Sequence, residues 1–196
     1  KYLKLVLLIV IPIASAFYFL REPIVTILLQ RGAFDIKSMQ ATAGILEGYA
    51  IAVVGQGILA ICLKYFLAER KILYPLLTYA GGTIVNIALD YYFVRTIGLP
   101  GLGYGAAAGA CINTLLLTVI IIRKLRVNLK NSLAEVFKVL LANVPLSVLF
   151  ILYGRLWNLL QIDGNLLHQA VYVILVVSTG GVVYWAGLHI FKAGNI

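Results

Sequence analysis

Charged residues are scarce in this chain: only 12% of its 196 residues are Asp, Glu, Lys or Arg, whereas 62% are hydrophobic. A soluble globular protein carries about 25% charged residues, so this composition indicates a protein embedded in lipid. Cysteine is also rare. Cys62 and Cys111 are too few for a disulfide framework, and each lies in an apolar run where a small buried side chain is expected.

Motifs of enzymes are absent as well. The sequence has no HExxH, no CxxC, no phosphate-binding glycine loop and no plausible nucleophile–base pair. The glycines from Gly101 to Gly105 follow an apolar segment rather than a strand, which excludes a dinucleotide site. His168 and His189 lie about six helical turns apart and cannot share a metal. We therefore predict that the chain is not an enzyme.

Six apolar segments are present, and each approaches or exceeds the roughly 20 residues that cross a bilayer. They are Leu3–Leu20, Met39–Phe66, Leu76–Val94, Leu102–Ile122, Val139–Leu159 and Leu166–Phe191. In lipid a segment must pair its own backbone polar groups, so each is predicted to be a helix. Pro12, Pro23 and Pro145 are expected to kink or break helices. The predicted fold is an all-α, polytopic membrane bundle with six transmembrane helices.

Basic residues are distributed unevenly if these six helices alternate in direction. Eleven fall on one side: Lys1, Lys4, Lys64, Arg70, Lys71, Arg123, Lys124, Arg126, Lys130, Lys138 and Lys192. The other side has Arg21, Arg31, Lys37, Arg95 and Arg155. The positive-inside rule then places both ends of the chain in the cytoplasm. The net charge of +9 is explained by topology and anionic lipid rather than nucleic acid. Arg123–Lys138 is expected to form a short amphipathic surface helix.

Polar residues share one face of the third segment. Tyr79, Thr83, Asn86 and Asp90 are separated by four, three and four residues, which is helical spacing. A carboxylate at membrane depth costs about 3 kcal/mol, so it normally faces a cavity or a partner. Asn86 and Asp90, with Thr83 nearby, could bind Na⁺, or Asp90 could take up a proton. Alternatively, Asp90 lies near the outer helix end and pairs with Arg95.

Small residues recur in the fourth segment at the spacing of a helix contact. Gly101, Gly105, Gly109 and Asn113 follow one another at intervals of four. Small residues allow two helix backbones to approach closely, and an asparagine can form a hydrogen bond across the contact. We therefore predict that these four residues pack against a neighbouring helix.

Three further polar residues are candidates for lining an aqueous cavity. Glu47 lies about three turns inside the second segment, which also contains Gln56, and Tyr79 begins the polar face of the third. Glu47 could equally lie near the lipid headgroups. Trp157, Trp185, the tyrosines and both histidines are suited to the membrane interfaces.

The stretch from Arg21 to Asp35, REPIVTILLQRGAFD, resembles a motif of the MurJ (MviN) family of lipid II flippases. This family belongs to the superfamily of multidrug, oligosaccharidyl-lipid and polysaccharide exporters. Two more tracts are similar to the family: Tyr49–Pro75, with Lys64 and Phe66, and the glycine-rich tract from Gly98 through Gly109 to Asn113. The resemblance covers about Leu5 to Leu125. The last two segments match in hydropathy and position alone.

The resemblance implies an architecture and an activity. Residues 1–125 would be the last four helices of the C-terminal lobe of the transporter. Residues 126–196 would form a basic cytoplasmic loop and two extra helices, whose hydrophobic groove suits a polyprenyl tail. The implied function is translocation of lipid II, a peptidoglycan precursor, across the bacterial inner membrane by alternating access. The implied partners are lipid II, membrane lipids and an N-terminal lobe, without which this chain, which begins at Lys1 like an excised piece, would be inactive.

This chain departs from the family pattern at two places. It has Glu69–Pro75 where the family has a short turn with Gly and Asp, and Ala106 where a threonine is common. Ala106 removes a hydroxyl that could complete a cation site with Asn86 and Asp90. No cofactor is predicted besides a coupling cation, Na⁺ or H⁺. The alternatives are a flippase for another polyprenyl-linked glycan, of O-antigen or teichuronic acid type, and a non-transporting membrane scaffold.

Overall fold

The computed structural model describes residues 2–29, 34–125, 129–160 and 166–191. Within these ranges the regular structure consists of seven α-helices, α1 (Tyr2–Phe19), α2 (Arg21–Leu29), α3 (Ile36–Ala68), α4 (Leu73–Ile97), α5 (Gly101–Leu125), α6 (Leu129–Leu160) and α7 (Leu166–Ile190). The predicted all-α class is confirmed.

Five of these helices contain stretches long and apolar enough to cross a membrane: Tyr2–Phe19, Ile36–Ala68, Gly101–Lys124, Leu133–Leu160 and Leu167–Ile190. They coincide with five of the six predicted spans. The sixth predicted span corresponds to α4, which has 25 residues and sufficient length but is less apolar. Its polar content includes Asn86 and Asp90, so the transmembrane character of α4 remains a prediction.

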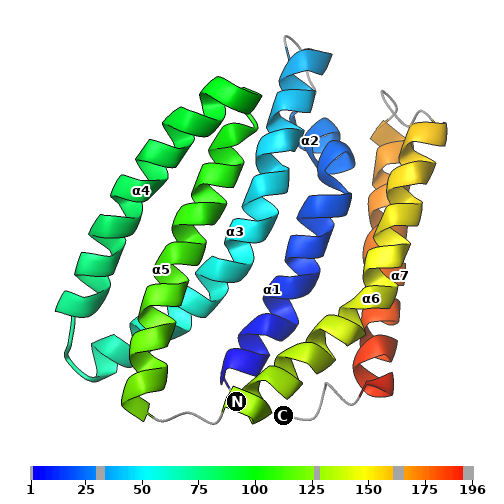
Figure 1. The fold of residues 1–196 in the computed structure, drawn as a ribbon. Coiled ribbons are helices and arrows are strands. Elements are labelled where there is room, and N and C mark those ends of the chain that lie inside the picture. Colours follow the sequence, from blue (N-terminus) through cyan, green and yellow to red (C-terminus); the bar gives the residue numbers. More distant parts are fainter. Residues whose placement is uncertain (1, 30–33, 126–128, 161–165, 192–196) are drawn as a thin grey trace.

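The helices run up and down in alternation (Figure 1). α4, α5, α3 and α1 follow one another across the molecule, with α6 and α7 beyond α1. The start of α1, the α3–α4 turn and the start of α6 lie at one end, as the predicted topology requires. Lys4, Arg70, Lys71 and Lys124 therefore share that end. Lys1, Arg31, Arg126 and Lys192 lie outside the described residues, as does the side chain of Lys130.

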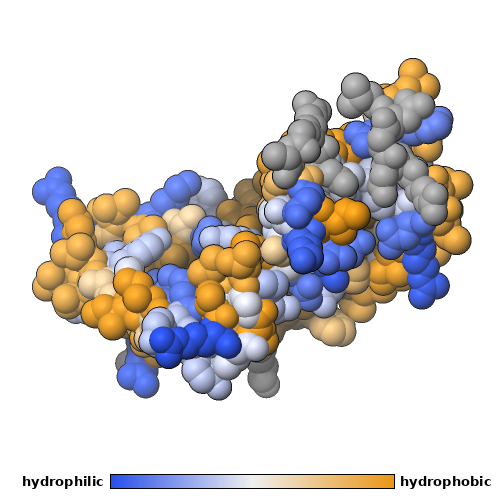
Figure 2. Space-filling model, turned by 90° about the horizontal axis from the view of Figure 1, so that it is seen from above, coloured by the Kyte–Doolittle hydropathy of each residue, from blue (hydrophilic) through white to orange (hydrophobic). Residues whose placement is uncertain are grey.

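The end of the molecule that contains the α4–α5 connection differs in polarity from the flanks. Seen from the end with the α4–α5 connection, hydrophobic side chains dominate both flanks, and hydrophilic ones lie between them (Figure 2). Among the exposed large hydrophobic residues are Ile84 and Ile87 of α4 and Ile174 and Val177 of α7. Such flanks are unsuited to water and suited to the acyl chains of lipid.

Local signals fix both ends of α3. Asp35 is the N-cap of α3, and its carboxylate accepts a hydrogen bond of 2.8 Å from the backbone N–H of Ser38. This bond holds the pKa of Asp35 below its usual value. After α3, Arg70 adopts a left-handed conformation (φ 54°), where glycine is the common choice. The N–H groups of Arg70 and Lys71 donate to the carbonyls of Leu67 and Phe66 and close the helix.

Two details of the helices differ from the sequence expectations. The break expected at Pro23 lies three residues earlier, at Leu20 between α1 and α2. Pro23 is the third residue of α2, because proline is tolerated in the first turn of a helix. The prediction of a short surface helix within Arg123–Lys138 was wrong. Residues 129–138 begin α6, a continuous helix of 32 residues with Pro145 in its interior. α6 changes direction along its length (Figure 1), as expected for a helix that contains proline.

Candidate functional site

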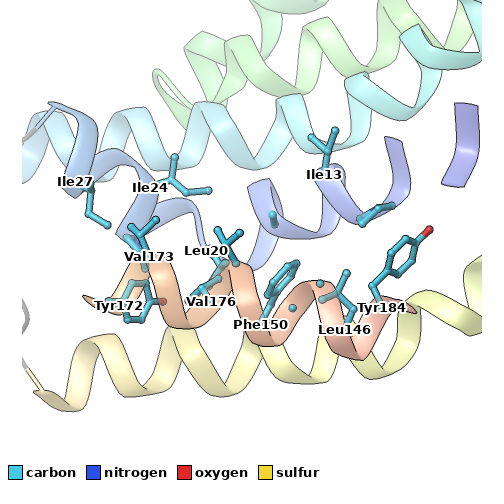
Figure 3. Close-up of a pocket in the computed structure, with 16 residues that line it drawn as sticks. Ile13, Leu20, Ile24, Ile27, Leu146, Phe150, Tyr172, Val173, Val176 and Tyr184 are labelled. Atoms are coloured by element: carbon cyan, nitrogen blue, oxygen red, sulfur yellow. The ribbon is translucent and has the colours of Figure 1, made fainter. Parts of the chain in front are cut away.

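An apolar groove separates α1 and α2 from α6 and α7. Its volume is about 380 Å³, and of its 16 lining residues only Tyr172 and Tyr184 have polar side-chain atoms. Ile13 of α1, Leu20 between the two helices, and Ile24 and Ile27 of α2 form one wall (Figure 3). The facing wall comes from α6 and α7, through Leu146, Phe150, Tyr172, Val173, Val176 and Tyr184. A groove with these walls accepts hydrocarbon.

Large aromatic side chains hold this groove in place. The Trp157 ring of α6 meets the Tyr172 ring of α7 edge-on, with centroids 4.9 Å apart. The Tyr184 hydroxyl donates to the backbone carbonyl of Leu8 at 2.6 Å and joins α7 to α1. Gly181 also lines the groove, and no atom lies within 4 Å of a Cβ placed on it. The groove is therefore bounded by these aromatic contacts and has free space beside α7.

The predicted ion-coupling residues lie where α4 packs against α5. A Cβ placed on Gly105 would overlap the carboxylate of Asp90, and one placed on Gly109 would lie 2.9 Å from Cβ of Asn86. A Cβ placed on Gly101 would lie 2.5 Å from the carbonyl carbon of Phe93. Glycine at these three positions allows α4 and α5 to approach with Asp90 and Asn86 between them.

Asp90 is half-buried in the α4–α5 seam, the helix contact that these three glycines form, and one of its two carboxylate oxygens lacks a partner. Its Oδ1 is buried and accepts no hydrogen bond from the described residues. The alternative partner, Arg95, lies instead over the ring of Tyr91, with the guanidinium carbon 4.1 Å from the ring centroid. A buried carboxylate oxygen without a donor suits a proton or a cation, because an unpaired charge in a low-dielectric seam is costly.

The other predicted site residues are distributed differently. Thr83 and Tyr79 on α4 and Gln56 on α3 are exposed, and they line neither of the two cavities described. Asn113 on α5 is buried, and its amide faces Gly82 of α4. The structure thus brings Asn86, Asp90 and Asn113 into one seam and leaves Thr83 and Tyr79 beside it.

Glu47 is part of a polar cluster between three helices. Its Oε2 lies 3.3 Å from Nε of Arg21, and its Oε1 accepts a hydrogen bond of 3.1 Å from the Tyr104 hydroxyl. Arg21 also donates to the carbonyl of Tyr18 at 2.8 Å. Glu47 thereby joins α2, α3 and α5. This cluster was not predicted from the sequence. The predicted topology places Arg21 and Glu47 toward the same side of the membrane, which could have indicated an ion pair.

A second and larger cavity, of about 960 Å³, lies between α1, α3, α5 and α6. Its walls are mostly apolar, and its lining residues with polar side-chain atoms are Ser15, Tyr18, Thr114, Thr118 and Asn143 together with Cys62 and Cys111. Asn143 donates to the hydroxyls of Ser15 at 2.5 Å and Ser147 at 3.1 Å. Thr114 donates to the carbonyl of Gly55, and the hydroxyl of Thr118 lies 3.6 Å from Sγ of Cys62, so most of these polar groups have a partner.

Metal-binding clusters are not found in the part of the chain that the structure describes. No three His, Cys, Asp or Glu residues there lie close enough to hold one ion. His189 packs on the ring of Trp185, with centroids 4.5 Å apart, near the end of α7.

Known proteins share both sequence and fold with this chain. A family model described as lipid II flippase MurJ matches residues 1–179. The lipid II flippase MurJ of Burkholderia cenocepacia is 34% identical over 115 residues, which are 59% of this chain and 22% of that protein. The probable lipid II flippase MurJ of Borreliella burgdorferi is 25% identical over 152 residues, 78% of this chain and 29% of that protein.

A solved structure has the same fold. A lipid II flippase MurJ in an inward closed conformation superimposes with a TM-score of 0.71 at 22% identity, over 96% of this chain and 37% of that one. The chain thus spans less than a third of these two relatives and about two fifths of the solved structure. With its five long apolar helices it is a multi-pass membrane protein. Because the family model matches nine tenths of its length, the chain belongs to the MurJ family of lipid II flippases.

Proposed function

We propose that the complete protein containing this chain translocates lipid II across the bacterial inner membrane by alternating access. The observation on which the proposal rests is the apolar groove between α1 and α2 on one side and α6 and α7 on the other. Its hydrocarbon walls suit a polyprenyl tail, which would remain beside α6 and α7 while the headgroup crosses. Transfer of a headgroup forms and breaks no covalent bond, so it needs no catalytic residue.

The remaining parts of the transporter would come from the portion of the protein that this chain does not cover. The relatives are more than three times as long as the regions matched here. A headgroup cavity needs a second lobe as its opposite wall. We therefore expect the 196-residue chain alone to be inactive.

The α4–α5 seam supports coupling of transport to a monovalent cation, Na⁺ or H⁺. The buried Oδ1 of Asp90 has no donor, and Asn86 lies one turn away on the same helix. When bound, the cation would neutralise the carboxylate and allow the two helices to stay close. Ala106 in place of the family's threonine removes one potential oxygen ligand, so the remaining ligands come from Asp90, Asn86 and their neighbours.

A depletion–rescue experiment tests the proposed function. Bacteria whose only lipid II flippase can be switched off would express the complete protein, with growth and outward exposure of lipid II as readouts. Gly181→Phe fills the groove, and Gly81→Phe on α4 is its matched control, since both glycines have open space at the Cβ position. We expect rescue by the parent and the control but not by Gly181→Phe. Absence of rescue by a well-inserted parent would favour another polyprenyl-linked glycan or the scaffold.

The proposed orientation places both ends of this chain in the cytoplasm. The segregation of basic residues to the end that contains the start of α1 supports it. A reporter that is active only in the cytoplasm, fused after residue 196, should be active. Activity of a reporter that works only outside the membrane would reverse the orientation.

A further inference from the structure

The junction between α1 and α2 has fewer backbone hydrogen bonds than a continuous helix. Pro23 has no N–H, so the carbonyl of Phe19, four residues earlier, lacks the donor that a helix usually provides. α2 itself has only nine residues, and a helix this short is not stable without contacts to its neighbours. Its direction matters because Ile24 and Ile27 belong to one wall of the apolar groove (Figure 3). Contacts outside the backbone must therefore hold this wall in place.

Arg21, the first residue of α2, makes such contacts. At 3.6 residues per turn it lies about 90° around the helix axis from Ile24 and Ile27, so it is directed away from the groove they line. Its Nε lies 3.3 Å from Oε2 of Glu47 on α3. Its guanidinium also donates to the carbonyl of Tyr18 at 2.8 Å, which ties the end of α1 to the start of α2. α2 is thus held from one side and lines the groove with another.

Glu47 projects from a place where two helix backbones touch. A Cβ placed on the next residue, Gly48 of α3, would lie 2.2 Å from the carbonyl carbon of Gly103 on α5. The residue after Gly103 is Tyr104, whose hydroxyl donates to Oε1 of Glu47 at 3.1 Å. This bond orients the carboxylate so that its other oxygen meets Arg21. The anchor for α2 is therefore built on a contact that allows little movement.

We propose that Arg21, Glu47 and Tyr104 form a strut that positions α2 and thereby sets the width of the groove for the polyprenyl tail. These three residues touch no ligand and act through Ile24 and Ile27. The side chains of Arg21 and Glu47 are 32% and 22% exposed, so water and salt screen this ion pair less than a surface pair. The inference rests on the proposed role of the groove in binding the tail.

The first measurement is the position of α2 in the complete protein in nanodiscs. Spin labels are attached at Leu28→Cys on α2 and Ile174→Cys on α7, both exposed positions, after the other cysteines have been replaced. The readout is the distribution of distances between the two labels. We expect a narrow distribution for the parent and a broader one for Glu47→Gln and Arg21→Gln. Glu69→Gln, which removes an ion pair at the other end of α3, is the matched control and should leave the distribution unchanged.

The second measurement is binding of geranylgeranyl phosphate, a short polyprenyl probe, with Gly181→Phe as the variant whose groove is filled. We expect Glu47→Gln and Arg21→Gln each to weaken binding by about fivefold, since the wall that they hold becomes loose. The double variant should lose no more than either single variant, because both remove the same bond. Tyr104→Phe keeps both charges and should have a smaller effect, and it replaces the charge variants if they do not fold.

The possible outcomes separate the strut from the proposed function. An unchanged distance distribution in Glu47→Gln and Arg21→Gln would overturn the strut, whatever the probe does. Losses of binding that add in the double variant would also overturn it, because the two residues would then act separately. A broader distribution combined with equal binding by the parent and Gly181→Phe would support the strut as the support of α2. It would at the same time overturn the groove as the site of the tail, on which the proposed function rests.

Discussion

The layer formed by α3, α5 and α4 and the pair formed by α6 and α7 are packed in opposite ways. In the layer, small residues such as Ala52 and Gly105 bring the helix backbones together. In the pair, large side chains such as Trp157 and Phe150 fill the contact and leave a groove beside it. Both solutions avoid the need for a hydrophobic driving force, which lipid does not supply between helices.

The difference matters for what each region can do. Close backbones hold the side chains of Asp90 and Asn86 between α4 and α5, which suits a small ion. Bulky aromatic residues keep α7 at a distance from α1, and an elongated apolar ligand fits the space between them. The same membrane environment thus yields a polar seam and an apolar groove within one chain.

The largest expected effect is the loss of the seam in Gly105→Leu. The new side chain would overlap the carboxylate of Asp90, and overpacking of a tight contact costs about 3 kcal/mol. We expect the complete protein to unfold at a clearly lower temperature in nanodiscs and to lose rescue activity. Gly181→Leu, at the open position of the groove, is the control and should unfold like the parent. Equal unfolding temperatures for both variants would show that the seam is not tightly packed.

A smaller effect is expected when the aromatic packing of the other region is removed by Trp157→Ala. Trp157 is only 3% exposed and packs on Tyr172. In lipid the lost contacts count but the transfer to water does not, so the destabilisation should be about 2 kcal/mol. Trp185→Ala is the control, because Trp185 is 65% exposed. The measurement is the unfolding temperature of the complete protein, and an equal decrease for both variants would contradict the assigned core.

Much of the layer could be predicted from the sequence because its signals are local. The spacing of four residues between Gly101, Gly105 and Gly109 indicates a helix contact whatever the partner, and the structure places α4 opposite it. Asn86 and Asp90 share a helix face for the same reason. Whether Asp90 pairs with Arg95 could not be predicted, because Tyr91 is the neighbour of Asp90 and competes for the same long side chain. The structure places Arg95 over the ring of Tyr91.

The groove depends on contacts between distant parts of the chain, so only one of its walls was foreseen. The expectation of a groove came from the resemblance and concerned the last two helices alone. The wall from α1 and α2 requires Leu8 and Tyr184 to meet across 176 residues, and no local pattern encodes that contact. The same holds for Arg21 and Glu47, because α2 was not recognised as a separate helix.

A minor effect is expected when one hydrogen bond is removed within the layer. Thr114→Val keeps the shape of the side chain but removes the bond to the carbonyl of Gly55. Bonds of this kind between membrane helices contribute about 0.6 kcal/mol, so the variant should unfold only slightly earlier than the parent. Thr83→Val, at an exposed position of α4, should have no effect. A large loss at Thr114 would mean that the polar bond, rather than backbone proximity, holds α3 and α5 together.

The smallest expected effect concerns the end of the layer outside the membrane. Glu69, which follows α3, pairs with Lys124 of α5 and lies 3.5 Å from Lys71. The hydrogen bond from Lys124 lowers the pKa of Glu69 below its usual 4.5. A carboxyl with a lowered folded pKa contributes stability above its unfolded pKa and loses that contribution as the pH falls through the folded value. The pairs are exposed, so the contribution is small and screened by salt.

The measurement is the unfolding temperature of the complete protein between pH 7 and pH 3, at low and high salt, for the parent and Glu69→Gln. Glutamine keeps the size of the side chain but has no charge to lose, so its curve should be flatter below pH 4.5. The difference between the two proteins should shrink at high salt, because salt screens exposed pairs. A difference that persists at high salt would mean that this connection is buried in the complete protein. The close packing of α3 and α5 would then extend past the membrane surface, and the contrast with the aromatic packing of α6 and α7 would be sharper.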